Sequence, residues 1–113
     1  MEAPTIYHRD GTYYLFFSAN DYGSIDYAVG YATSASLTGP YQDAAENPIL
    51  ATAGRAIGPG HQSLIEDRDG DLWMVYHAWD TSFLDREVWI DELIFEDGRP
   101  TVLGPDDDPQ EAP

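Results

Sequence analysis

The second half of the sequence matches the first half, and this internal repeat restricts the possible folds more than any other feature. The match places position 61 on position 2 and runs without a gap, and it aligns strongly apolar, β-prone segments as well as identical residues. Identical pairs include Ile6 and Ile65, Arg9 and Arg68, Asp10 and Asp69, Gly11 and Gly70, Ala19 and Ala78, Asp21 and Asp80, Asp26 and Asp85, and Gly39 and Gly98. A long repeat that holds several strands and no helix is typical of β-propeller blades.

Each copy is predicted to be a blade of antiparallel strands. Asp10-Gly11 and Asp69-Gly70 are hairpin turn signals between β-branched and aromatic runs. The predicted strands are residues 4–9, 12–19 and 26–34 in the first copy and 63–67, 72–77, 85–95 and 100–103 in the second. The sequence therefore predicts an all-β chain of about two blades, with repeats at about 2–57 and 58–103. The remaining residues 104–113 are acidic and rich in proline, so we expect a disordered tail.

A stiff loop brings one histidine to the start of a predicted strand. His61 follows Gly58-Pro59-Gly60, a run that combines flexible and rigid backbone positions. The match between the two halves aligns His61 with Glu2. Because the first strand of each blade lines the axis of a propeller, we expect this acid and this imidazole to share one axial cavity. From spacing alone, His61 could equally be a histidine that only caps a turn.

The charge of the chain excludes some classes of partner. It has 21 Asp and Glu residues against five Arg, no Lys and a net charge of −16, so nucleic acids and anionic membranes are not expected partners. Adaptation to high salt and codon bias against lysine explain this composition equally well. The chain has no cysteine, no apolar run that could span a membrane and no signal peptide in its first residues. Its localisation is left open.

One acidic segment resembles part of a calcium loop. Residues 67–71 read Asp-Arg-Asp-Gly-Asp, but an EF-hand has a longer loop, a distal Glu and flanking helices. Here the flanks are predicted strands, and Asp10-Gly11 repeats the turn. The segment is therefore interpreted as a hairpin.

Several motifs in combination resemble glycoside hydrolase family 43. The segments that carry the resemblance cover roughly residues 2–103 and are Glu2-Ala3-Pro4, residues 11–18 (GTYYLFFS), 27–34 (YAVGYATS), 37–41 (LTGPY), 47–50 (NPIL), 58–63 (GPGHQS) and 75–79 (VYHAW). The resemblance implies a five-bladed β-propeller. It also implies hydrolysis, usually with inversion, of arabinan, arabinoxylan or xylan fragments.

The resemblance also implies roles for three residues. Glu2 falls on the general acid of the family, and His61 falls on the axial histidine that in many members helps to hold a calcium ion or an ordered water. Because calcium prefers oxygen ligands, such an ion near His61 would be mostly water-coordinated. Arg86 resembles an arginine that contacts the sugar in some members, although a surface ion pair with Asp85 or Glu87 is as consistent with its sequence position.

The chain differs from the family pattern in one important respect. The family uses two further catalytic aspartates on blades that precede the Glu-Ala-Pro motif, and this chain begins at that motif. We therefore expect a C-terminal part of a hydrolase, which is active only with the missing blades. The alternative is a non-catalytic module that binds carbohydrate through aromatic residues such as Trp79, or that self-associates through its exposed blade faces. A truncated product without a function of its own is a third possibility.

Overall fold

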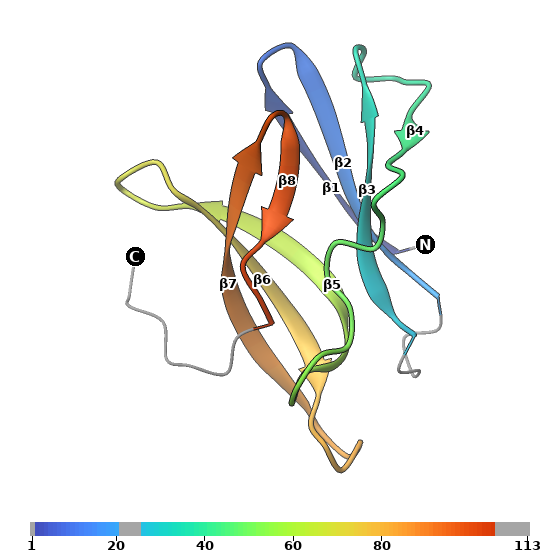
Figure 1. The fold of residues 1–113 in the computed structure, drawn as a ribbon, viewed down its shortest axis with the longest axis vertical. Coiled ribbons are helices and arrows are strands. Elements are labelled where there is room, and N and C mark those ends of the chain that lie inside the picture. The colour runs from blue at the N-terminus through green and yellow to red at the C-terminus, as the bar shows by residue number, and fades with distance from the viewer. Residues whose placement is uncertain (1, 21–25, 106–113) are drawn as a thin grey trace.

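The computed structural model describes residues 2–20 and 26–105, with the backbone alone for Glu2. These residues form two four-stranded antiparallel sheets and no helix, so no described helix could cross a membrane (Figure 1). In each sheet every strand pairs with the next one along the chain. The first sheet contains β1 (Glu2–Arg9), β2 (Thr12–Ala19), β3 (Ala28–Ser34) and β4 (Gln42–Asp43). The second contains β5 (Ile57–Glu66), β6 (Leu72–Trp79), β7 (Arg86–Glu96) and β8 (Arg99–Val102). The prediction of an all-β chain is confirmed.

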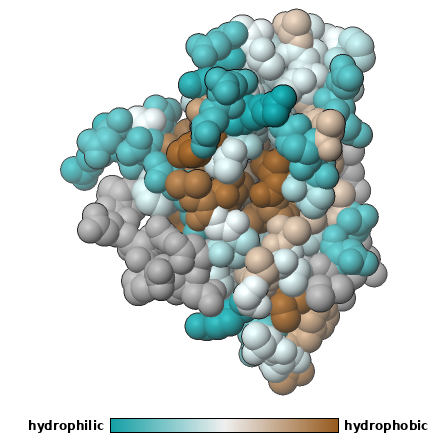
Figure 2. All heavy atoms as spheres, in the orientation of Figure 1, coloured by the Kyte–Doolittle hydropathy of each residue, from teal (hydrophilic) through white to brown (hydrophobic). Residues whose placement is uncertain are grey.

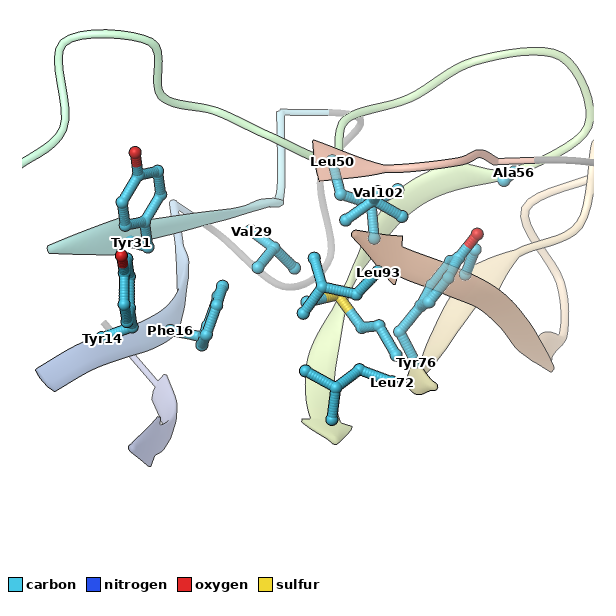
Figure 3. Close-up of a cluster of buried hydrophobic side chains, with 12 residues drawn as sticks. Tyr14, Phe16, Val29, Tyr31, Leu50, Ala56, Leu72, Tyr76, Leu93 and Val102 are labelled. Atoms are coloured by element: carbon cyan, nitrogen blue, oxygen red, sulfur yellow. The ribbon is translucent and has the colours of Figure 1, made fainter. Parts of the chain in front are cut away.

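The strands follow the period of two that buries one face of a sheet. Along β6, Leu72, Met74, Tyr76 and Ala78 are buried, and the residues between them are only partly buried. These side chains belong to one hydrophobic cluster with Leu93 of β7 and the aromatic residues of the first sheet. Figure 3 shows Leu72, Tyr76 and Leu93 on one side of this cluster and Tyr14, Phe16 and Tyr31 on the other. The core therefore lies between the two sheets. Figure 2 shows hydrophobic side chains gathered between them, below a hydrophilic region.

The first strand of the second sheet is the element that joins the two sheets. β5 contacts β1, β2 and β3 of the first sheet. Gly60 of β5 lies directly against the fully buried ring of Tyr27, so closely that a Cβ at Gly60 would be 2.1 Å from Tyr27 Cε2. At the other end of the interface, the Tyr14 hydroxyl donates a hydrogen bond of 2.7 Å to the carbonyl oxygen of Gly98. β5 begins at Ile57, earlier than predicted, because the chain continues to pair with β6 through two irregularities in the register.

The two hairpin turns differ in length, and this corrects the alignment of the repeats. Arg9 pairs with Thr12 across a two-residue turn, whereas Glu66 pairs with Leu72 across a longer loop. The ungapped match is therefore wrong within the first strands, where the true correspondence is displaced by one position.

The strand pairing identifies the true equivalents of Glu2 and His61. Glu2 pairs with Ser18 and Gly60 pairs with His77, and the aligned second strands place Ser18 on His77. Gly60 therefore occupies the position of Glu2, and His61 occupies the position of Ala3. Both Ala3 (φ 51°) and His61 (φ 50°) have left-handed backbones, which non-glycine residues rarely adopt.

Candidate functional site

The candidate site lies where the first strands of the two sheets begin. Glu2 starts β1, and its backbone pairs with Ser18 near the end of β2. The Ser18 hydroxyl accepts a hydrogen bond of 2.7 Å from the backbone N–H of His61 on β5. The fold thus brings the backbones of Glu2 and His61 to opposite sides of one serine, although they are not equivalent positions of the repeat. The Glu2 side chain lies outside the described part of the structure.

Gln62 links the sheets immediately beside these two residues. Its side chain is almost fully buried, with 2% of the residue exposed. Gln62 Nε2 donates a bond of 2.7 Å to the Ala3 carbonyl, and Gln62 Oε1 accepts one of 2.9 Å from the Ser18 hydroxyl. The Thr5 hydroxyl donates a longer bond of 3.3 Å to the Gln62 carbonyl. Both ends of the amide therefore have a partner on the first sheet.

The sequence analysis singled out neither Ser18 nor Gln62. The only signal for Ser18 is a polar residue on the face of β2 that otherwise carries Tyr14 and Phe16. Gln62 was visible only as the neighbour of His61. Their bonds join segments that lie far apart along the chain, so local patterns could not reveal them.

The His61 side chain is exposed and belongs to a row of rings. The centroids of His61 and His77 are 5.8 Å apart with nearly parallel planes, and the centroids of His77 and Tyr27 are 6.1 Å apart. The left-handed backbone of His61 and the bond from its N–H fix the start of its side chain. The imidazole is therefore available to solvent or to a ligand at this end of the strands.

The described residues do not provide an oxygen cage for calcium around His61. His61 belongs to no group of three or more described His, Cys, Asp or Glu side chains with ligand atoms within 4.8 Å of one another. Because calcium takes six to eight oxygen ligands, these residues do not fit an ion held by this part of the chain alone. Any ion at His61 would depend on water or on residues beyond the described set.

Asp67, Asp69 and Asp71 do form such a group, but the bonds of Asp67 identify it as a turn. Asp67 Oδ1 accepts hydrogen bonds from the backbone N–H groups of Asp69 and Asp71, and its Oδ2 accepts one of 2.9 Å from the Trp73 indole. The indole bond, followed by the bonds within the turn, holds the pKa of Asp67 below its ordinary value. The hairpin interpretation of this segment fits these contacts.

Arg86 lies at the start of β7, opposite Trp79 at the end of β6. Its guanidinium carbon is 5.3 Å from the Trp79 ring centroid, and Phe83 stacks on Trp79 at 4.8 Å. Within the described residues, Arg86 has no ion pair with Asp85 or Glu87. The arginine is thus part of an aromatic group at the β6–β7 turn, where Leu84 is 77% exposed.

A hollow of about 820 Å³ lies on the first sheet, but it contains none of the predicted site residues. Its lining includes Phe17, Ala28, Gly30 and Asn47. The Asn47 amide is bonded to the backbone of Tyr31 at both ends, at 2.9 and 2.8 Å. The hollow is therefore lined mainly by apolar residues and amides, and its one acidic lining residue among the described residues is Asp26, which lies just before β3 of the first sheet.

Comparison with known proteins identifies the family. The sequence profile of glycosyl hydrolases family 43 matches residues 1–100. The chain belongs to this family. A crystal structure of a thermostable family-43 glycoside hydrolase superimposes on 99% of the chain with a TM-score of 0.90 and 40% sequence identity. The family 43 relatives with solved structures are β-propellers, so the two sheets are two blades of this fold, as predicted.

Curated family 43 relatives differ in the sugars that their names give. The chain is 30% identical over 100 residues to a β-D-galactofuranosidase of Aspergillus niger, and 32% identical over 93 residues to an extracellular endo-α-(1→5)-L-arabinanase of Bacillus subtilis. These matches cover 86% and 73% of this chain. The chain spans only 29% and 28% of those two proteins and 38% of the thermostable hydrolase.

Proposed function

We propose that this family 43 chain supplies the general acid of an inverting glycoside hydrolase, with Glu2 as that acid. The observation that carries the proposal is the meeting of the two first strands at Ser18, whose backbone pairs with Glu2 and whose hydroxyl binds His61. The proposal places an acid and an imidazole at the same end of the blades, close to the propeller axis.

The chemistry requires more than this chain's blades. An inverting glycosidase protonates the leaving oxygen with one carboxylic acid and activates water with a second carboxylate about 6.5–9.5 Å away. Most described carboxylates of this chain lie on turns or at exposed positions, and the buried Asp91 on β7 accepts a hydrogen bond of 2.6 Å from the Tyr76 hydroxyl within the second sheet. The proposal therefore assigns the second carboxylate to other blades of the propeller. Burial of Glu2 in the closed propeller would raise its pKa and keep it protonated.

The substrate class of the proposal is arabinose- or xylose-containing plant saccharides. Relatives include a β-xylosidase of Bacillus subtilis, and the solved structures include a Cellvibrio cellulosa α-L-arabinanase complexed with arabinohexaose, which is 29% identical with a TM-score of 0.72. Arg86 is proposed to contact the sugar, because its guanidinium is already held over Trp79 at an exposed turn. His61 is proposed to anchor an ordered water or a water-coordinated calcium ion.

A hybrid propeller provides the test of this function. This chain would replace the matching segment of the thermostable family 43 hydrolase, and hydrolysis of aryl arabinofuranosides and xylosides would be measured. Glu2→Gln should lower kcat on the order of 10²- to 10⁴-fold, as expected for the loss of a general acid. Glu66→Gln is the matched control, because it makes the same chemical change at an exposed position at the far end of β5. Equal activity of both variants would refute the role of Glu2.

A carbohydrate-binding module is the second candidate, favoured by one observation. Trp79 and Phe83 form a stacked pair beside the exposed Leu84, and paired aromatic rings are a suitable surface for a sugar. If this function is correct, the 113-residue chain should bind arabino- or xylo-oligosaccharides in calorimetry, Trp79→Ala should abolish binding and Glu2→Gln should leave it unchanged. Loss of binding in Glu2→Gln alone would exclude this candidate.

A further inference from the structure

Gln62 is placed to control the backbone that carries Glu2. The carbonyl that it binds belongs to Ala3, the next residue after Glu2. The hydroxyl that it accepts from belongs to Ser18, the pairing partner of Glu2. One buried amide therefore reaches both strands that define the position of the proposed acid.

The backbone at Ala3 needs such support. Ala3 has a φ of 51°, and the register of β1 against β2 shifts between Glu2 and Thr5. A bulge of this kind interrupts the ladder of hydrogen bonds, and a left-handed alanine is an unfavourable conformation that its surroundings must hold in place. The bond from Gln62 Nε2 gives the Ala3 carbonyl the partner that the interrupted ladder does not provide.

The same amide also fixes His61 on the other strand. Ser18 uses its proton to bind Gln62 Oε1, and its lone pair then accepts the N–H of His61. This order of donors and acceptors makes the three groups one chain of hydrogen bonds. Removing the amide leaves the Ala3 carbonyl without its donor and frees the Ser18 hydroxyl to rotate.

We infer that Gln62, which lies on the neighbouring blade, is a positioning residue. It sets the distance between Glu2 and the leaving oxygen of the sugar. The inference rests on the proposed function of Glu2. Gln62 takes no part in bond breaking. It orients the strand on which the acid stands, and it holds His61 in a fixed position at the same time.

The experiment compares two substrates whose leaving groups differ in their need for protonation. A displaced acid should slow only the substrate that needs protonation, whereas a general loss of structure should slow both. In the hybrid propeller, kcat/KM is measured for a dinitrophenyl glycoside, which needs little protonation, and for an alkyl glycoside, which needs the acid. Gln62→Met keeps the volume of the side chain and removes both hydrogen bonds. It should lower kcat/KM for the alkyl glycoside about 10- to 100-fold, the effect of a small displacement of a reacting group, and leave the dinitrophenyl glycoside nearly unchanged.

Tyr14→Phe is the matched control, because it removes another hydrogen bond between the sheets about 13 Å further along β2. It should affect the two substrates equally. Gln62→Glu is the second variant if Gln62→Met does not fold. It retains an acceptor for Ser18 and places a carboxylate oxygen against the Ala3 carbonyl, so it should show the same dependence on the leaving group.

Glu2→Gln in the same hybrid distinguishes the two ways in which this reasoning could fail. If the loss of kcat/KM in Glu2→Gln depends on the leaving group and the loss in the Gln62 variants does not, Gln62 has no positioning role and the proposed function stands. If Glu2→Gln affects both substrates equally, the proposed acid itself is wrong, and the positioning role is overturned with it. In the isolated chain, Gln62→Met should speed amide exchange of His61 at least about tenfold, and unchanged exchange would overturn the inference directly.

Discussion

The contact between Gly60 and Tyr27 makes a strong prediction about how the two blades hold together. Gly60 has an ordinary backbone conformation, since its φ is not positive, so alanine can adopt it without strain. The added Cβ of Gly60→Ala would lie 2.1 Å from Cε2, 2.6 Å from Cδ2 and 2.8 Å from Cζ of Tyr27. Carbon atoms in favourable contact are about 3.5–4.0 Å apart, so the ring and the strand must separate by more than about 1 Å.

The Tyr27 ring has no free space to move into, because Tyr27 is fully buried. Overpacking by one carbon typically destabilises a core by about 1–3 kcal/mol, and expulsion of a buried aromatic ring by about 3–5 kcal/mol. The loss of backbone freedom in the unfolded chain offsets about 0.4–1 kcal/mol of this effect. We therefore expect Gly60→Ala to lower the free energy of unfolding by about 1–4 kcal/mol, measured by urea unfolding of the chain.

A double-mutant cycle decides whether the ring is the cause. In a Tyr27→Ala background the ring is absent, so Gly60→Ala should be neutral or slightly stabilising. The two changes should therefore show a coupling energy of about 1 kcal/mol or more. A similar loss of stability from Gly60→Ala in both backgrounds would refute the steric argument.

Three further predictions follow from individual contacts. Tyr14→Phe removes a hydrogen bond between the sheets and should lower the free energy of unfolding by about 1 kcal/mol in urea. The Trp73 indole lowers the pKa of Asp67, so the stability due to Asp67 is present above about pH 4 and is lost as the pH falls through its folded-state pKa. The melting temperature of Asp67→Asn should therefore change less than that of the unmodified chain between neutral and acidic pH. Burial, followed by the bond to Glu46, raises the pKa of Tyr31. Above about pH 10 Tyr31 therefore ionises only in the unfolded chain, and the stability of the fold should decrease. Tyr31→Phe should weaken this loss of stability at alkaline pH.

The sequence predicted the strands well because local patterns determine them. The Asp10-Gly11 turn forms between strands whose side chains alternate between core and exterior, and such patterns act over a few residues. The observed strand ends differ from the predicted ends where hydrogen-bond pairing with a neighbouring strand, and not the propensity of the residues, determines them. β3 begins at Ala28, slightly after its predicted start at residue 26, and β5 begins at Ile57, well before its predicted start at residue 63.

The alignment of Glu2 with His61 failed for a physical reason. Identities at a constant offset extend through the turn. The second turn is nevertheless one residue longer, because Asp67 bonds to Asp71 across three residues whereas Arg9 pairs with Thr12 across two. A slip of one residue exchanges the faces of a strand, so equivalence by sequence and equivalence by structure differ there. The two residues nevertheless lie near one another, because β1 and β5 are adjacent and Ser18 stands between them.

The number of blades limits what copies of this chain could build. Each copy contributes two blades, so a ring made only of whole copies has an even number of blades and cannot be the five-bladed propeller of family 43. The outer faces of the two blades expose hydrophobic side chains, among them Val88 on β7, which is 82% exposed, while the net charge of −16 opposes association. Light scattering at low and high salt therefore separates the proposed functions. Screening of the charge should favour any contact between these faces, and a discrete even-bladed ring would support the self-assembling module. A chain that forms no closed ring at either salt requires different blades to complete its propeller, as the hydrolase function does.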